Sequence, residues 1–217
     1  AARHAIMSGP PATGAAPPAS HWKRYRVLYA VLAVCIAPVL ASYFAYYVAP
    51  PSGRTNYGTL IVPPRPVPAT MRMTRLDGTE FSFRSLAGTW VMVSASPADC
   101  TEPCQAALLQ MRQQRLMTGK EQERVERVWL VMDDAPLATP VLRDYAGTHV
   151  VRAPAGAVRE FLPLDGASAL EGFVWLVDTM GNVMLRWPRD PEPQKVKKDL
   201  ARLLTASSHW VRVDRKY

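Results

Sequence analysis

Cysteine and histidine are scarce in this chain of 217 residues, which contains three cysteines and four histidines. Three cysteines are too few for the disulfide framework of a small secreted domain. The sequence also lacks a phosphate-binding loop, a zinc-ligand spacing and a Ser-His-Asp arrangement. These absences exclude the common nucleotide-binding, zinc-binding and serine-hydrolase classes, and they direct attention to the few cysteines.

A basic stripe is also lacking, although 26 Lys and Arg outnumber 18 Asp and Glu and give a net charge of +8. The basic residues are scattered over unrelated segments, and their one cluster beyond the N-terminal region is Lys195, Lys197 and Lys198. A scattered charge favours a solvated basic surface over a nucleic-acid interface. We therefore expect no nucleic-acid partner, while attraction to anionic lipid headgroups stays open.

Charged side chains are absent from residues 27–48, the run VLYAVLAVCIAPVLASYFAYYV. A helix of this length crosses roughly 30 Å of hydrocarbon, and Pro38 is tolerated in a membrane span, where it kinks the helix. Cys35 lies within the run and is expected only to pack. Basic residues crowd one flank and aromatic residues the other, as in membrane anchors: Lys23, Arg24 and Arg26, then Tyr43, Phe44, Tyr46 and Tyr47.

A cleaved signal peptide is the alternative interpretation of this run. Its apolar region would be shorter and would be followed by small residues at a cleavage site, whereas this run ends in bulky aromatic residues. We therefore expect an uncleaved, single-pass anchor. Because the positive flank stays in the cytoplasm, the sequence predicts a bacterial inner-membrane protein with its N-terminus in the cytoplasm and its C-terminal domain in the periplasm.

Composition divides the rest of the chain. Residues 1–26 are rich in Ala, Pro and Gly and end in the basic flank, which is typical of a disordered cytoplasmic tail. Residues 49–69 include PPSGRTNYG and PPRPVP, which predict a Pro-rich linker. Residues 70–206 carry the periodic patterns of a folded domain, and residues 207–217 are expected to form a basic C-terminal tail.

Strand and helix patterns alternate through residues 70–206. Asp77-Gly78 favours a tight hairpin between two short strands, and TWVMVSAS at 89–96 fits a strand buried on both faces. Further helices are expected at 105–117, 139–145, 157–164 and 193–206, and further strands at 128–132, 149–154, 172–178 and 182–187. This order predicts an α/β, thioredoxin-like mixed sheet flanked by helices and preceded by one transmembrane helix.

Cys100 and Cys104 fall where the predicted buried strand ends and the following helix begins. Backbone N–H groups and the helix dipole stabilise a thiolate at such a position. The two sulfurs could undergo redox exchange, bind a soft ion such as Cu(I), or form a permanent structural disulfide. The spacing leaves these alternatives open. We predict that Cys100, nearer to the strand end and the more exposed, is the attacking thiolate and that Cys104 resolves the mixed disulfide.

The run LDGTEFSFRSLAGTWVMVSASPADCTEPC resembles the corresponding stretch of the Sco/SenC family, membrane-anchored thioredoxin-like proteins of cytochrome oxidase assembly. VMDDAPLATPVLRDYAGTH and FVWLVDTMGNVM resemble further segments, so the resemblance covers most of Met71 to Ala206. It implies copper as a cofactor, with Cys100 and Cys104 as two of its ligands. It also implies a partner, either a respiratory haem-copper oxidase subunit or one of its assembly factors.

Departures from the family pattern mark this chain as a divergent member. The family's copper-binding histidine is expected about eight residues before Asp178, where this chain has Leu170, so the third ligand is unknown. Asp134 of the family's acidic loop is retained, but Leu137 and Ala138 stand where the family has Arg and Asp. Gln105 stands where a proline usually follows the second cysteine. None of the remaining histidines or late methionines is a firm replacement: His149, His209, Met180, Met184, and His4 and His21 before the span.

Three functions are compatible with this sequence. The leading one is a membrane-anchored, Sco-like assembly factor for a haem-copper oxidase, acting by thiol–disulfide exchange, by Cu(I) handling or by both. The second is a periplasmic thiol–disulfide oxidoreductase without copper, which the lost histidine favours. The third is a non-catalytic interaction protein with a structural disulfide. Whether the chain is an enzyme stays open; as an enzyme it would be a thiol–disulfide oxidoreductase.

Overall fold

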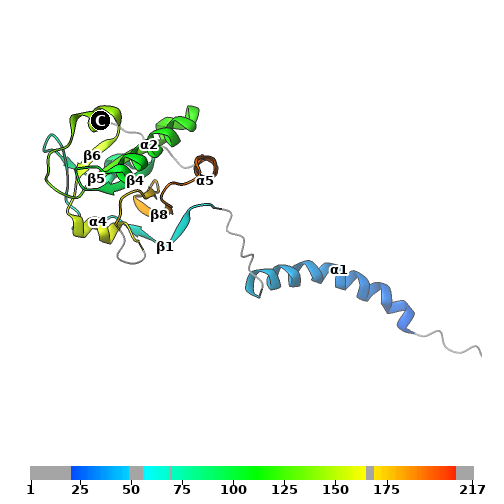
Figure 1. The fold of residues 1–217 in the computed structure, drawn as a ribbon. Helices are drawn as coiled ribbons and strands as arrows, with labels where there is room; N and C mark the ends of the chain where they lie inside the picture. Colours follow the sequence, from blue (N-terminus) through cyan, green and yellow to red (C-terminus); the bar gives the residue numbers. More distant parts are fainter. Residues whose placement is uncertain (1–20, 49–55, 69, 165–168, 209–217) are drawn as a thin grey trace, which may run out of the picture. The chain divides into compact units, whose positions relative to one another are not determined.

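The computed structural model describes residues 21–48, 56–68, 70–164 and 169–208 (Figure 1). The chain divides into two units, residues 1–54 and 55–217, which are described separately. Most of the expected N-terminal tail, residues 49–55 and 69 of the expected linker, and the expected C-terminal tail from residue 209 lie outside the described residues. His4 and His209 therefore lie outside them as well.

The first unit contains one long apolar helix, α1 (His21–Tyr47), with Pro38 inside it. Its stretch Tyr25–Tyr47 has a mean hydropathy of 2.2 and is long and apolar enough to cross a membrane. All side chains described along this stretch are exposed. The predicted apolar helix near the N-terminus is thus confirmed, by length and composition.

The second unit contains an eight-stranded mixed sheet in the order β1-β8-β7-β4-β5-β6-β2-β3. Strands β4, β5 and β6 run parallel, and the other pairings are antiparallel. The strands are β1 (Thr59–Pro66), β2 (Met73–Arg75), β3 (Glu80–Phe81), β4 (Trp90–Ser96), β5 (Val125–Val131), β6 (His149–Arg152), β7 (Val174–Val177) and β8 (Asn182–Trp187).

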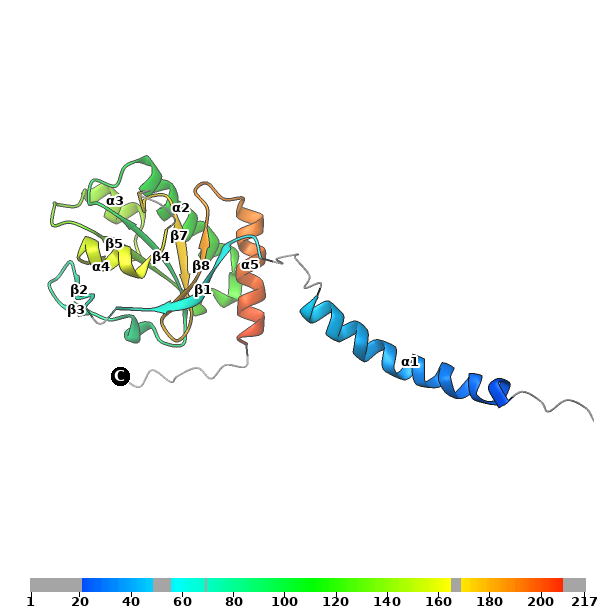
Figure 2. The ribbon, with the colours of Figure 1, turned by 90° about the horizontal axis from the view of Figure 1, so that it is seen from below.

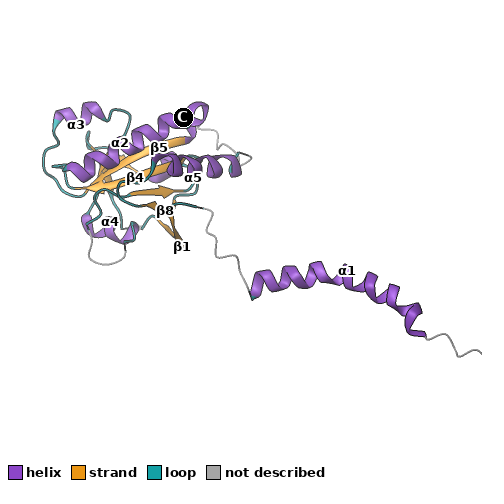
Figure 3. Cartoon of the chain, turned by 45° about the vertical axis from the view of Figure 1, so that its right-hand side comes forward, coloured by secondary structure: helices purple, strands orange, loops and turns teal. Residues whose placement is uncertain are grey.

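Helices cover both faces of this sheet, with α2 and α5 on one side and α4 on the other (Figure 3). Two apolar cores result, and β4 contributes to both because successive strand residues face opposite sides. Val91, Val93 and Ala95 enter the core under α4, and Trp90 and Met92 enter the core under α2 and α5. The helices are α2 (Glu102–Met117), α3 (Thr139–Asp144), α4 (Ala155–Phe161) and α5 (Pro193–Ala206), with 3₁₀ turns at Phe83–Leu86 and Gly119–Arg124. The predicted thioredoxin-like mixed sheet is confirmed.

Part of the expected linker belongs to this sheet, which corrects the sequence interpretation. Residues 59–66 form β1, which pairs antiparallel with β8, Leu60 opposite Leu185 and Arg65 opposite Val183 (Figure 2). Proline cannot donate a hydrogen bond to a neighbouring strand and is tolerated at sheet edges. Because β1 is the edge strand, its prolines are compatible with a strand, although their density is typical of a linker.

Candidate functional site

Cys100 and Cys104 are joined by a disulfide at the end of β4, with their Cα atoms 5.1 Å apart. Cys104 is the third residue of α2, and Cys100 lies in the loop before that helix. Cys100 has φ +38°, a left-handed conformation that is uncommon for a residue with a side chain. The predicted placement of the pair, between a buried strand and a helix start, is therefore confirmed; these two elements, β4 and α2, are labelled in Figure 1.

Both cysteines are buried, so the expectation that Cys100 is the more exposed of the two describes a negligible difference. Cys100 is 1% exposed and Cys104 is 0% exposed. The two residues belong to the apolar core under α2 and α5, and Leu137 and Tyr145 pack against this core. Segments distant in sequence thus contribute to the core that holds the disulfide. Because the two sulfurs are almost equally buried, the order in which they are attacked has to be argued from their hydrogen-bond partners.

Ser96, the last residue of β4, lies directly beside Cys104 in this core. Its hydroxyl is 3.0 Å from the Cys104 sulfur and 3.0 Å from the Pro97 carbonyl oxygen. The indole N–H of Trp129, on the neighbouring strand β5, donates to the Ser96 oxygen at 2.8 Å. All three side chains are buried. A polar group is therefore held against one sulfur within an otherwise apolar core.

Asp133 supports the loop that leads into Cys100. Both of its carboxylate oxygens accept the Ala98 N–H at 3.2 Å. The Arg152 guanidinium donates in turn to the Asp133 carbonyl and, at 2.9 Å, to the Ala135 carbonyl. Sequence reasoning assigned no site role to Asp133. Its position two residues after β5, which runs parallel to β4, was the signal that could have placed it beside the cysteine loop.

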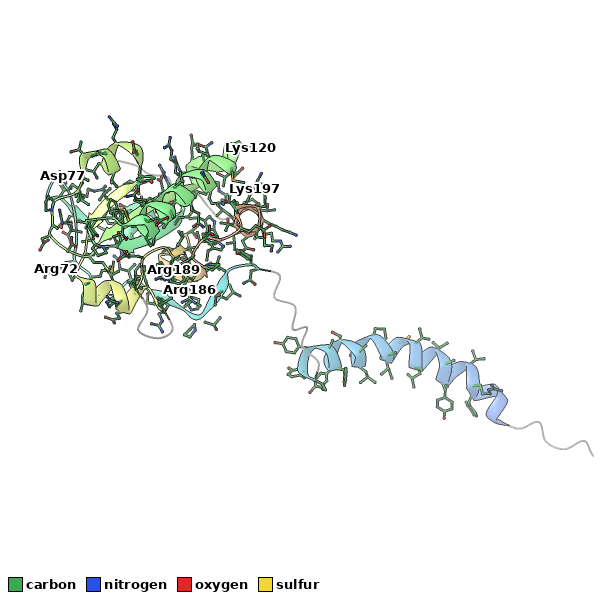
Figure 4. All side chains as sticks on the ribbon, in the orientation of Figure 1. Arg72, Asp77, Lys120, Arg186, Arg189 and Lys197 are labelled. Atoms are coloured by element: carbon green, nitrogen blue, oxygen red, sulfur yellow. A yellow bond between two sulfur atoms is a disulfide. The ribbon has the colours of Figure 1, made fainter. Side chains whose placement is uncertain are left out.

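A second loop, residues 169–173, lies against the segment between the two cysteines. The Thr101 hydroxyl donates to the Glu171 carboxylate at 2.8 Å. Gly172 has φ +83°, and a Cβ built there would lie 3.2 Å from the Cβ of Pro103, so this approach suits glycine. Arg189, labelled in Figure 4, donates to the carbonyls at 169 and 171 at 2.8 Å each and stacks over the Phe173 ring. The loop is therefore held from both sides.

Leu170 belongs to this loop, but its side chain packs in the core under α4. It is 3% exposed, whereas the disulfide belongs to the core on the other side of the sheet. Glu171, the next residue, is the one that contacts the cysteine segment. Among the described residues, no group of three His, Cys, Asp or Glu side chains could hold a metal.

The other candidate ligands lie away from the disulfide. His149 on β6 lies opposite Val128 on β5. Val128 in turn lies opposite Val93, which is three residues before the end of β4. Its ring nitrogens face Glu126 at 3.6 Å and Arg75 at 3.4 Å. Met180 is exposed on the β7–β8 turn, at the opposite end of β4. Met184 precedes Leu185, which is joined through β7 to the first half of β4. The side chain of His21 is outside the described part.

Acidic and polar groups surround the cysteine segment on a chain whose net charge is positive. Asp99 and Glu102 flank Cys100 and are exposed, and Glu171 and Asp133 approach from the two neighbouring loops. Tyr145 donates from its hydroxyl to the Gln105 carbonyl at 3.2 Å. Burial, followed by the nearby Asp144 carboxylate, raises the pKa of Tyr145 above its ordinary value, so its hydroxyl stays a donor at neutral pH.

Solved structures that are similar to this chain include an electron transfer protein, Sco proteins and thiol–disulfide exchange proteins. A proposed electron transfer protein of Aquifex aeolicus VF5 has a TM-score of 0.51 and 15% identity, covering 67% of this chain and 96% of that chain. Yeast Sco1 with copper bound has a TM-score of 0.49 and 14% identity, covering 76% of this chain and 100% of that chain. A thiol:disulfide interchange protein of Chlorobium tepidum TLS has a TM-score of 0.46 and 22% identity, covering 65% of this chain and 96% of that chain. The similarity to the Aquifex aeolicus protein, with a TM-score above 0.5, shows a shared fold.

A comparison with curated proteins finds no match. A family model does match, and it covers most of the residues of both cores together with the cysteine pair. It spans residues 90–207, which is more than half of the 217 residues, and extends from the start of β4 to just beyond α5. The chain therefore belongs to the family described as transmembrane-like, thioredoxin-like, C-terminal domain.

Proposed function

We propose that this chain is a membrane-anchored thiol–disulfide exchange protein whose Cys100–Cys104 pair transfers electrons to or from cysteines of another protein. The observation that carries the proposal is the disulfide itself, closed between the end of β4 and the first turn of α2. Ser96 touches one of its sulfurs, and Asp133 and Glu171 brace the segments on either side. A helix start stabilises the thiolate that reduction releases.

The exchange proceeds in two balanced steps. A client thiolate attacks the Cys100 sulfur, forms a mixed disulfide and releases Cys104 as a thiolate. A second client thiolate then attacks the client sulfur of that mixed disulfide, which leaves an oxidised client and a second free thiolate on Cys100. Cys104 suits the role of leaving sulfur because it lies in the first turn of α2 and next to the Ser96 hydroxyl. With a reduced chain and an oxidised client, the same steps run in reverse.

The client we infer is a cysteine pair of a respiratory haem-copper oxidase or of one of its assembly factors. Its support is the resemblance of Leu76–Cys104 and the later segments to the Sco/SenC family. The apolar stretch Tyr25–Tyr47 would keep the domain at the membrane in which such an oxidase is assembled. The basic flank of this helix favours a domain on the non-cytoplasmic side, where disulfides persist.

Copper is the cofactor that the resemblance implies, and the residues present fit it only in part. Reduction of the disulfide gives two thiolates, a donor type that Cu(I) prefers. The family's third position is Leu170, an apolar side chain in the opposite core, so the three-ligand site does not fit. We therefore assign the exchange chemistry to Cys100 and Cys104 and derive no step through copper.

Cysteine variants of the full chain in detergent test the exchange function. Wild type, reduced and then mixed with an oxidised dithiol substrate, is expected to return to the disulfide through a mixed disulfide. Cys104→Ser is expected to accumulate the mixed disulfide on Cys100, and Cys100→Ser is expected to lose exchange. Cys35→Ser, which changes the cysteine of α1, is the matched control and is expected to behave as wild type. Exchange that survives in Cys100→Ser would contradict the proposal.

The client and copper are tested separately. In cells that need this chain for respiration, Cys100→Ser is expected to leave the oxidase cysteines in the wrong redox state and to lower oxidase activity. Unchanged activity would contradict the inferred client. Anaerobic titration of the reduced chain with Cu(I) tests metal handling. Tight one-to-one Cu(I) binding that vanishes in the double cysteine variant would contradict the proposal that the exchange proceeds without copper.

A further inference from the structure

The Ser96 hydroxyl has three polar neighbours and only one hydrogen to donate. Its oxygen lies 2.8 Å from the Trp129 indole nitrogen, 3.0 Å from the Pro97 carbonyl oxygen and 3.0 Å from the Cys104 sulfur. Indole nitrogen is a donor only, so the Ser96 oxygen must accept from Trp129. The hydroxyl hydrogen is then left for either the carbonyl or the sulfur.

The choice between these two acceptors depends on the redox state of the cysteines. A disulfide sulfur is a weak acceptor, and the Pro97 carbonyl is the stronger one. A thiolate carries a full negative charge, and hydrogen bonds to charged groups are about twice as strong as neutral ones. In the oxidised protein the hydrogen therefore favours Pro97, and after reduction it favours Cys104.

We propose that Ser96 is a redox-linked positioning residue, whose hydroxyl hydrogen turns from the Pro97 carbonyl to the Cys104 sulfur when the disulfide is reduced. This inference rests on the proposed exchange function and deepens it. Trp129 contributes by fixing the Ser96 oxygen, so that the hydroxyl can rotate while the oxygen stays in contact with the sulfur.

The burial of these groups makes the effect large enough to matter. Cys104 is 0% exposed and Ser96 is 1% exposed. A thiolate in such an apolar core lacks solvation by water, which disfavours its formation. One charge-assisted hydrogen bond from Ser96 offsets part of this cost. It stabilises the reduced state, raises the reduction potential and makes Cys104 the better leaving sulfur when a client thiolate attacks Cys100.

The strand offers a matched control for this proposal. Ser94 lies two residues before Ser96 on β4 and is equally buried, and its hydroxyl donates to the Phe173 carbonyl at 3.2 Å. Replacing Ser94 by Ala removes a buried hydroxyl from the same strand. The bond that it removes is directed to a carbonyl of the 169–173 loop and does not involve the Cys104 sulfur.

The first measurement is the equilibrium of the full chain in detergent with reduced and oxidised glutathione. For Ser96→Ala we expect the equilibrium constant for reduction to fall about tenfold, which is about 30 mV more negative for a two-electron couple. Ser94→Ala is expected to match wild type. Equal equilibrium constants for wild type and Ser96→Ala would overturn the inference.

The second measurement is the thiol titration of Cys104 in chains that carry Cys35→Ser and Cys100→Ser, so that Cys104 is the one titrating thiol. Adding Ser96→Ala is expected to raise the pKa of this thiol, because the thiolate loses its donor. This titration needs no exchange. A wild type that fails to exchange with glutathione would contradict the proposed function, while an unchanged thiol pKa would contradict the role of Ser96.

A shape-matched pair of variants separates the effect of the hydroxyl from any loss of folding in Ser96→Ala. Threonine and valine have nearly the same shape, and only threonine carries a hydroxyl. We expect Ser96→Thr to keep a wild-type-like equilibrium with glutathione, and Ser96→Val to show the tenfold fall. If Ser96→Thr and Ser96→Val give the same equilibrium constant, the hydroxyl has no role and the proposal is wrong.

Discussion

The hydroxyl of Thr101 donates a hydrogen bond of 2.8 Å to the carboxylate of Glu171, across 70 residues of sequence. Thr101 lies between the two cysteines, and Glu171 lies in the loop before β7. The neighbouring Leu170 directs its side chain into the core under α4. Within this loop, the side chain that reaches the cysteine segment is therefore that of residue 171, one position after the one at which the family resemblance places its histidine.

This geometry predicts different outcomes for two histidine substitutions. Glu171→His is expected to place an imidazole beside the reduced cysteines and to raise Cu(I) affinity at least about tenfold, because it adds a third donor of a type that copper accepts. Leu170→His is expected to give no such gain and to lower stability by about 2–4 kcal/mol, because it puts a polar ring into an apolar core. Anaerobic competition with a Cu(I) chelator measures both.

Glu171→Gln serves as the control for this comparison, since it keeps an acceptor for Thr101 without adding an imidazole. It is expected to bind Cu(I) as wild type does. A gain in Leu170→His without one in Glu171→His would show that the side chain at 170, and not the one at 171, can reach the sulfurs.

Arg127 provides a prediction on stability. It is 4% exposed, its Nη2 donates to the Ala146 carbonyl at 3.1 Å, and its Nε and Nη1 have no partner among the described residues. Burial, followed by the charges of Arg115 and Arg112, lowers the pKa of its guanidinium. Arg127→Met is therefore expected to raise the free energy of unfolding by about 1–3 kcal/mol, as when buried charges are replaced by apolar side chains.

Thermal unfolding of the full chain in detergent, followed by near-UV circular dichroism, measures this effect. The exposed Arg143, whose side chain is 82% accessible, is the control. Arg143→Met is expected to change the melting temperature very little. A fall in the melting temperature of Arg127→Met would mean that the buried charge has a favourable partner.

Asp199 of α5 is a buried charge whose removal is expected to lower stability, in contrast to Arg127. Its buried carboxylate accepts the N–H groups of Tyr57 and Gly58 at 2.9–3.0 Å and the indole N–H of Trp187 at 3.3 Å. Asp199→Ala leaves two buried donors and one half-buried donor without an acceptor, so we expect a loss of about 2–4 kcal/mol of stability. The same unfolding measurement checks it, with the exposed Asp144→Ala as control. A loss below about 0.5 kcal/mol would contradict the anchoring role.

Most of the sheet and helices could be predicted from the sequence because their patterns are local. TWVMVSAS indicated the buried strand β4, and Asp77-Gly78 indicated the β2–β3 hairpin, in which Gly78 has φ +83°. Edge strand β1 was missed because prolines at 63, 64 and 66 are typical of a linker. Its place in the sheet depends on pairing with β8, more than a hundred residues later.

The cysteine pair could be found from its spacing, but its surroundings could not. The burial of Cys100 and the contacts of Glu171 arise from segments distant in sequence. Ser96 is four residues from Cys100, yet nothing local distinguishes it from Ser94. The difference is made by Trp129, whose indole reaches Ser96 from the neighbouring strand. Contacts across a sheet are set by register, which a single sequence specifies only weakly.

The orientation of the domain relative to the membrane gives the last prediction. Val62 on β1 is 83% exposed, so a cysteine there is reachable by a membrane-impermeant maleimide. In a Cys35→Ser background, Val62→Cys is expected to be labelled from the non-cytoplasmic side of intact inner membranes and to stay in the membrane fraction. The background chain is the control, because its remaining cysteines form a buried disulfide. Labelling only after lysis would indicate a cytoplasmic domain, and a labelled soluble product would indicate a cleaved signal peptide. A cytoplasmic domain would remove the physical basis for contact with the oxidase at the periplasmic surface, and a cleaved signal peptide would remove the anchoring at the membrane. Both results would leave the exchange chemistry of Cys100 and Cys104 to be tested independently.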